Sequence, residues 1–166
     1  LFGNLLKMQH DKLKKIKANY QGAVKMSKED KQQQVKKLLE AGQGALRQEE
    51  DSEVEARLLQ AINLDKSNLP AFFRLGKFYD DQRKWTEARE TLKYALKLAR
   101  KKSAAEQGTA PEVTPQEIYF CLAGIEREAG DLAAALDYIQ DALELEPASP
   151  RYLDLILDLS IMKKDQ

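Results

Sequence analysis

The fold is decided by residues 68–98, NLPAFFRLGKFYDDQRKWTEARETLKYALKL. The apolar face of its first half consists of Phe72, Leu75, Gly76 and Tyr79. The apolar face of its second half consists of Ala88, Leu92, Ala95 and Leu96. Spacings of three and four residues in both halves predict two amphipathic helices joined by a short polar segment. We therefore expect a helical hairpin, and one hairpin cannot bury its own apolar face, so further hairpins should flank it.

The pattern resembles the tetratricopeptide repeat (TPR), a helical hairpin of about 34 residues. Counted from Leu69, an aromatic residue holds the fourth place, Leu-Gly the seventh and eighth, and Tyr the eleventh. An earlier copy begins at Val35 and places Leu38, Gly42, Ala45, Leu58 and Ala61 at signature positions. A later copy begins at Gln116 and supplies Tyr119, Leu122, Ala123, Ala135, Ile139, Ala142 and Pro147. Val54 and Glu126 depart from the pattern, which usually has Ala and Tyr at those places.

This resemblance, which includes bacterial TPR scaffold proteins, implies an all-α solenoid of helical hairpins with about three repeats. We divide the chain into a basic lead helix and helix start (1–34), repeats 35–68, 69–102 and 116–147, and residues 148–166. The last segment is either a capping helix or a truncated fourth repeat. The insertion 103–115 has no aromatic residue or charge cluster with which to recognise a ligand, so we interpret it as a spacer rather than a functional loop.

Capping residues mark the expected helix ends. N-terminal caps are expected at Ser27, Ser52, Asn68, Thr86, Thr114 and Asp131. Trp85 precedes one of these caps and is expected to act as a hydrophobic staple. Gly130 is expected to end the first helix of the third repeat, because glycine adopts the left-handed conformation that follows many helices.

The composition indicates a helical protein in a reducing compartment. The chain has 166 residues and a single cysteine, so an internal disulfide and a cysteine-built metal site are both excluded. No apolar run approaches the roughly 20 residues that span a bilayer. We expect a cytoplasmic protein, with tethering to a membrane by a segment upstream of this chain as an alternative.

Charge is distributed unevenly along the chain although its net charge is zero. Residues 1–37 carry ten Lys against three acidic residues, and residues 103–166 carry four basic against thirteen acidic residues. Within residues 1–26, Leu6, Leu13 and Tyr20 form a narrow apolar stripe on a lysine-rich helix. This helix either covers the first repeat or contacts an anionic membrane surface.

No constellation of catalytic residues is present in the sequence. His10, the single histidine, lies on the lead helix without another ligand at metal-binding spacing, and Cys121 lies in a predicted helix without a histidine nearby. Carboxylates occur in runs such as 49–51 and 126–128, which we interpret as solvated faces and turns. We expect no enzyme, cofactor or metal site. Nucleic acid is not an expected partner, because aromatic residues are not interleaved with the lysines.

In TPR proteins the first helices of successive repeats line a concave groove that binds a peptide or a helix. The resemblance assigns to this groove Leu39, Gln43, Leu46, Arg47, Phe73, Arg74, Lys77, Asp80, Phe120 and Arg127. We expect a protein-interaction scaffold whose partner carries apolar anchors with acidic flanks. The alternatives are an electrostatic adaptor held at a membrane through residues 1–26, a self-associating protein, and a purely structural role for Phe73 and Phe120.

Some TPR proteins clamp the terminal carboxylate of chaperone peptides with Lys and Asn at set places of the groove. In this chain Leu39, Gln43, Phe73 and Cys121 are among the residues at those places. The clamp is therefore absent, and binding of chaperone tails is not predicted.

Overall fold

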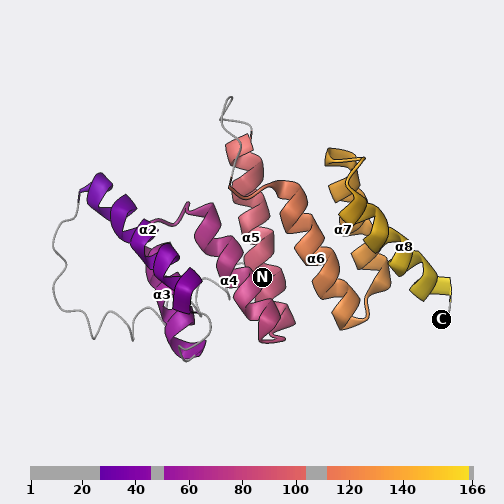
Figure 1. Ribbon diagram of the computed structural model, residues 1–166, viewed down its shortest axis with the longest axis horizontal. Helices are drawn as coiled ribbons and strands as arrows, with labels where there is room; N and C mark the ends of the chain where they lie inside the picture. The colour runs from indigo at the N-terminus through magenta and orange to yellow at the C-terminus, as the bar shows by residue number, and fades with distance from the viewer. Residues whose placement is uncertain (1–26, 46–50, 104–111, 165–166) are drawn as a thin grey trace.

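The computed structural model describes residues 27–45, 51–103 and 112–164, and for 41–45 and 103 it describes the backbone only. Seven helices make up the regular structure of this part of the chain (Figure 1). They are α2 (Lys28–Ala45), α3 (Asp51–Leu64), α4 (Leu69–Asp81), α5 (Trp85–Ser103), α6 (Pro115–Ala129), α7 (Leu132–Leu145) and α8 (Pro150–Lys164). The lead helix expected in residues 1–26 lies outside the described residues.

The helices stand in a row that follows the chain from α2 to α8 (Figure 1). Each helix packs on the one before it and the one after it, and α4 also touches α6. Helices α2 and α3, α4 and α5, and α6 and α7 form three antiparallel hairpins, and α8 packs on α7. The expected all-α array of TPR-like hairpins is confirmed.

Several helix ends form as the sequence predicts. The side chain of Asn68 accepts a hydrogen bond from the amide of Ala71, 2.9 Å away, and Asp131 caps α7 in the same way. Thr114 and Glu117 form a reciprocal capping box at the start of α6. Gly130 adopts φ 84° and ends α6 in the left-handed region that glycine tolerates best.

Two predicted caps are wrong. Ser52 lies within α3, which begins at Asp51, and Thr86 lies within α5, which begins at Trp85. The first turn of α5 already runs from the carbonyl of Lys84, which accepts a hydrogen bond from the amide of Ala88 at 2.9 Å. Thr86 therefore follows the helix start instead of preceding it, so neither its capping role nor the staple role of Trp85 is available.

Helices α4 and α5 cross at a glycine. A Cβ atom added to Gly76 would lie 2.6 Å from both Cγ and Cδ2 of Leu92, which is fully buried. Beside this crossing the rings of Phe72 and Tyr94 pack with their centroids 4.5 Å apart. The absence of a side chain at Gly76 thus allows a large residue of the opposite helix to fill the space between the two backbones.

A polar pair joins each hairpin to the one before it. The hydroxyl of Tyr79 on α4 donates to Glu55 on α3 at 2.7 Å, and burial together with that carboxylate raises the pKa of Tyr79. One hairpin further on, Arg89 on α5 donates to both carboxylate oxygens of Glu126 on α6, at 2.5 and 2.7 Å. Counted from the repeat starts, Tyr79 and Glu126 hold the same place, and so do Glu55 and Arg89.

The sequence-based interpretation of Glu126 as part of a solvated carboxylate run is wrong. Its side chain is only 5% exposed and forms a bidentate ion pair with Arg89, which also raises the pKa of the arginine. The sequence pattern shows which face of α6 carries this carboxylate but not that an arginine of α5 lies opposite it. Burial without a partner would be unfavourable, whereas the paired group joins two hairpins.

Replacing Gly76 by leucine tests the close crossing. We expect Gly76→Leu to lower the free energy of unfolding by about 1 to 3 kcal/mol or more, because the added side chain overlaps Leu92. Gly124→Ala is the matched control, since a Cβ at Gly124 meets no atom within 4 Å and alanine favours a helix. Thermal melts followed by circular dichroism measure both, and an unchanged midpoint for Gly76→Leu would contradict the crossing.

Exchanging one polar pair for the other tests their equivalence. Arg89→Glu alone should lower the free energy of unfolding by about 3 kcal/mol or more, because it places a second carboxylate beside the buried Glu126. Adding Glu126→Tyr to that variant rebuilds the tyrosine–carboxylate pair seen between α4 and α3, so most of the loss should be recovered. Chemical denaturation measures the two variants. A double variant no more stable than Arg89→Glu would show that the positions are not equivalent.

Candidate functional site

A cavity of about 380 Å³ opens between the first hairpin and α4. Its size lies within the range of small-ligand pockets, about 300 to 1,000 Å³. The apolar walls are Leu38, Leu39, Val54, Leu58, Phe73, Phe78 and Val113. The charged residues at its edge are Arg57, Arg74, Lys77, Asp81 and Glu112. The cavity thus combines an apolar interior with three cations and two anions, an arrangement suited to one or two apolar side chains of an extended or helical segment.

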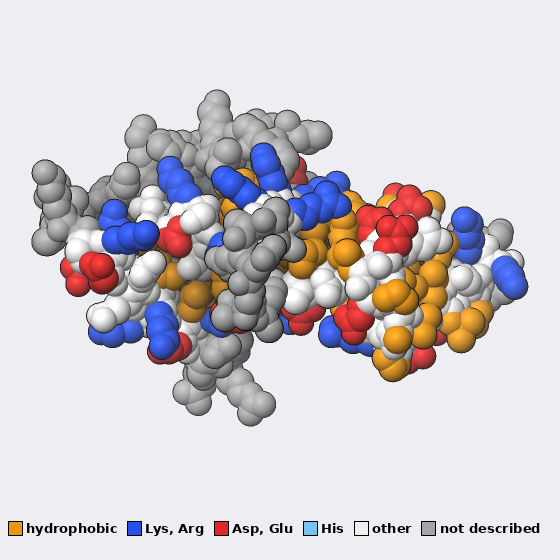
Figure 2. Space-filling view, turned by 90° about the horizontal axis from the view of Figure 1, so that it is seen from above, with side chains coloured by type: hydrophobic (Ala, Val, Ile, Leu, Met, Phe, Trp, Pro, Cys, Tyr) orange, Lys and Arg blue, Asp and Glu red, His pale blue; other side chains and the backbone are white. Residues whose placement is uncertain are grey.

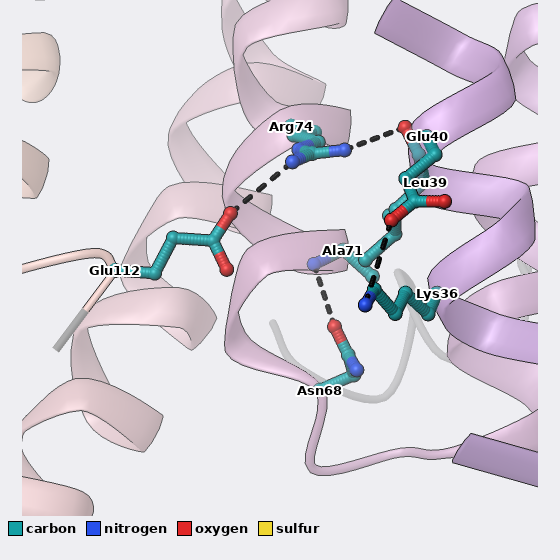
Figure 3. A network of polar contacts seen from close by, with 7 residues as sticks. All are labelled: Lys36, Leu39, Glu40, Asn68, Ala71, Arg74 and Glu112. Carbon is teal, nitrogen blue, oxygen red and sulfur yellow. Dashed lines mark hydrogen bonds and ion pairs between the residues drawn. The ribbon is translucent and has the colours of Figure 1, made fainter. Parts of the chain in front are cut away.

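Arg74 lines the cavity and lies between Leu39 and Glu112 (Figure 3). One terminal nitrogen of its guanidinium donates to the carbonyl of Leu39 on α2 at 2.7 Å, and the other donates to Glu112 at 3.2 Å. Arg74 is therefore the residue that connects α2, α4 and the segment that precedes α6. The two hydrogen bonds thus join α2 and the segment before α6 to α4 beside the cavity.

Phe73 and Lys77 occupy adjacent turns of α4. The ammonium of Lys77 lies 5.8 Å from the centroid of the Phe73 ring, within the range of a cation–π interaction. Phe73 is half-buried and packs against the core, whereas Lys77 is exposed. The pair places an apolar anchor and a positive charge side by side at the edge of the cavity.

A second aromatic–cation group lies between α6 and α8. The guanidinium of Arg151 lies 4.1 Å from the centroid of the Phe120 ring, and the ring of Tyr152 lies 5.5 Å from that of Phe120. Burial raises the pKa of Tyr152, with Glu146 adding to the effect and Arg151 opposing it. Phe120 is thus covered on one side by an arginine, as Phe73 is by Lys77.

Cys121 on α6 is half-buried, and charged residues of α4 and α8 act on its thiol. Burial raises its pKa to about 11, while the charges of Lys77 and Arg151 oppose the rise and Asp80 adds to it. Lys77 and Asp80 belong to α4 and Arg151 belongs to α8. A protonated, half-buried thiol is a poor nucleophile.

The sequence-predicted groove residues occupy several environments. Leu39, Phe73, Arg74 and Lys77 come together at the cavity. Asp80 is half-buried near Lys77, and burial raises the pKa of its carboxyl. Arg127 is half-buried and pairs with the neighbouring Glu128 at 3.1 Å, and Phe120 lies against Arg151. The side chains of Gln43, Leu46 and Arg47 lie outside the described residues.

Sequence reasoning missed Glu112, Val113 and Arg151. The first two end the insertion that was interpreted as a spacer, yet they form part of the cavity wall. A signal was present, since an acidic residue and an apolar residue directly precede the cap Thr114. The aromatic contact of Arg151 could not be found from the sequence, because it depends on how α8 packs beside α6.

Large apolar side chains are exposed at the C-terminal end of the array, where Figure 2 shows orange side chains on the surface. They are Leu145, Leu153, Leu157, Ile161 and Met162. Among the described residues, no group of three or more His, Cys, Asp or Glu side chains could hold a metal ion. In the same part of the chain, no helix has the length and apolar character needed to cross a membrane.

No protein-family model and no curated protein sequence matches the chain. Solved TPR structures match its fold at 16–17% sequence identity. The N-terminal domain of stress-induced protein-1 from C. elegans has a TM-score of 0.67 over 78% of this chain and 97% of that domain.

Two further structures were determined with peptides. The first TPR domain of Spaghetti (RPAP3), bound to the HSP90 peptide SRMEEVD, gives a TM-score of 0.65 over 80% of this chain and 94% of that one. The Yersinia enterocolitica type III secretion chaperone SycD, in complex with a peptide of the translocator YopD, gives 0.63 over 78% and 94%. The chain therefore has the TPR fold.

The reactivity of Cys121 tests the environment assigned to it. A pKa of about 11 lowers the thiolate population near neutral pH by about 100-fold relative to an ordinary cysteine. We expect a maleimide to label the native protein at least about 100-fold more slowly than the protein in denaturant at the same pH. Mass spectrometry measures both rates. Equal rates would show that the thiol is neither buried nor raised in pKa.

Proposed function

We propose that the chain is a non-enzymatic interaction module that binds a segment of another protein along α2, α4 and α6. The observation that carries this proposal is the cavity between the first hairpin and α4, whose apolar interior is edged by Arg74 and Lys77. Such a site can bury one or two apolar side chains of a partner while the cations hold acidic side chains beside them.

The solved neighbours support a peptide partner. SycD and the first TPR domain of Spaghetti are each described in complex with a peptide. Because these proteins share at most 17% of their residues with this chain, the likeness supports the type of ligand and not its identity. The absence of the Lys and Asn clamp in this sequence argues that the ligand is held by its side chains rather than by a terminal carboxylate.

The chemistry of the partner follows from the two aromatic–cation groups. Phe73 with Lys77 and Phe120 with Arg151 each present a ring and a positive charge together. A segment with apolar anchors and Asp or Glu beside them would satisfy both groups. The cations already stacked on the rings would keep these contacts while their charge attracts the partner.

The uneven charge of the chain favours a second role, that of an electrostatic adaptor. Ten lysines within residues 1–37 would attract an anionic membrane surface by about 1 kcal/mol for each residue close to it. In that case the repeats serve as a spacer in the cytoplasm. Flotation with phosphatidylserine vesicles, with and without residues 1–26, distinguishes this adaptor from the groove-binding module.

Peptide selection followed by titration tests the groove. Peptides selected on the immobilised chain from a displayed random library should be rich in Asp, Glu and large apolar residues. A selected peptide should bind Phe73→Ala about 30-fold more weakly than the parent, because losing an aromatic anchor typically costs about 2 kcal/mol. Lys77→Glu should weaken binding several-fold and reduce its dependence on salt. Isothermal titration calorimetry measures these affinities.

Lys93→Glu is the matched control for the charge change, because Lys93 is exposed on α5 and does not line the cavity. The Lys93→Glu variant should bind the selected peptide with the same affinity as the parent. Melting temperatures verify that all variants are folded. Equal binding by the parent and Phe73→Ala would remove the groove as the site and leave the lysine-rich segment 1–26 as the remaining candidate.

A further inference from the structure

The end of the insertion is bound to the candidate site although it belongs to a distant part of the chain. Glu112 lies 38 residues from Arg74 in sequence, and their side chains pair at 3.2 Å (Figure 3). Val113, only 5% exposed, lines the same cavity as Leu39 and Phe73. An acidic residue and an apolar residue in succession therefore contact the cation and the apolar wall of the groove.

Helix capping accounts for part of this arrangement only. Val113 directly precedes the cap Thr114, so it stands where a hydrophobic staple would pack against Ile118 in the first turn of α6. Glu112 takes no part in that capping box, which consists of Thr114 and Glu117. Glu112 forms its ion pair with Arg74 on α4, and the capping of α6 does not explain this contact.

The ion pair of Glu112 is weak enough to be exchanged. The Glu112 side chain is 66% exposed, so its ion pair with Arg74 is screened by water and contributes little to stability. Arg74 keeps its hydrogen bond to the carbonyl of Leu39 when Glu112 leaves, and so remains positioned for another carboxylate. An external segment with the same chemistry can thus take the place of Glu112 without disturbing the rest of the groove.

We propose that Glu112 and Val113 are an internal ligand of the groove, which a partner with an acidic residue followed by an apolar residue displaces. This inference rests on the proposed function and specifies its partner: an extended segment in which Glu or Asp pairs with Arg74 and the next apolar residue enters the cavity. The partner can bind only while Glu112 and Val113 are away from the site. Its affinity is therefore multiplied by the fraction of time that the site is free. Occupancy of nine tenths corresponds to about ten-fold weaker binding.

The probe is a capped peptide with the sequence of residues 109–115, TAPEVTP, and its charge-reversed counterpart TAPKVTP is the peptide control. The double variant Glu112→Gln, Val113→Ser should bind TAPEVTP about ten-fold more tightly than the parent does, and TAPKVTP should bind neither protein. Glu112→Gln alone should give a smaller gain of several-fold, and it decides the matter if the double variant is unfolded. Glu144→Gln, an equal charge change at an exposed position of α7, should match the parent.

Equal affinity of TAPEVTP for the parent and for the Glu112 and Val113 variants, or no binding to any of them, would overturn the internal ligand. The library-selected peptide separates this failure from that of the proposed function. If its binding depends on Phe73 but not on residues 112 and 113, the groove is the site and only the internal ligand is refuted. If its binding does not depend on Phe73, both proposals fail.

Discussion

At Gly76 helix α4 comes so close to α5 that Leu92 occupies the space where a Cβ atom would be. This close approach sets the geometry of the central hairpin, because two backbones can cross at that distance only where one residue has no side chain. The central hairpin in turn supports the hairpins on both sides, since α4 packs on α3 and touches α6, while α5 packs on α6. The position of α4, and with it that of the cavity residues Phe73, Arg74 and Lys77, therefore depends on the close crossing with α5.

Adjacent hairpins are joined by apolar packing and by several polar contacts, and at each junction one of the polar pairs stands at a repeated place. Tyr79 donates to Glu55 at the first junction, and Arg89 donates to Glu126 at the second. In the first pair the carboxylate belongs to the earlier hairpin, and in the second pair it belongs to the later hairpin. Both pairs nevertheless form a hydrogen bond at the same place, between α3 and α4 and between α5 and α6. Buried polar groups favour one arrangement over others because an incorrect stacking leaves them without partners. These pairs thus provide a reason why the hairpins stack in one register.

The cations of the candidate groove contact aromatic rings and oxygen atoms of the same chain. Lys77 and Arg151 each lie over an aromatic ring, while Arg74 holds a backbone carbonyl and the carboxylate of Glu112. Each cation thereby makes a contact within the chain, and the acidic segment that we propose as the partner would meet charges that are already placed. Fixing side chains before binding reduces the entropy lost when a partner arrives. The insertion contributes to this order at its described end, where Glu112 and Val113 contact the site.

The sequence by itself determined the hairpins, the crossing glycine Gly76 and the caps Asn68, Thr114 and Asp131. These features depend on residues three or four apart, whose relation is fixed by helix geometry. Ser52 and Thr86 were misplaced because a shift of one residue at a helix start leaves the periodic pattern unchanged. The resemblance to TPR proteins also assigned Leu39, Phe73, Arg74 and Lys77 to one groove, and all four line the cavity. Only the tertiary structure decided which distant residues meet them, such as Glu112 with Arg74, or Glu126 with Arg89. A helical pattern gives the direction of a side chain but not its partner, which depends on the angle and distance at which hairpins stack.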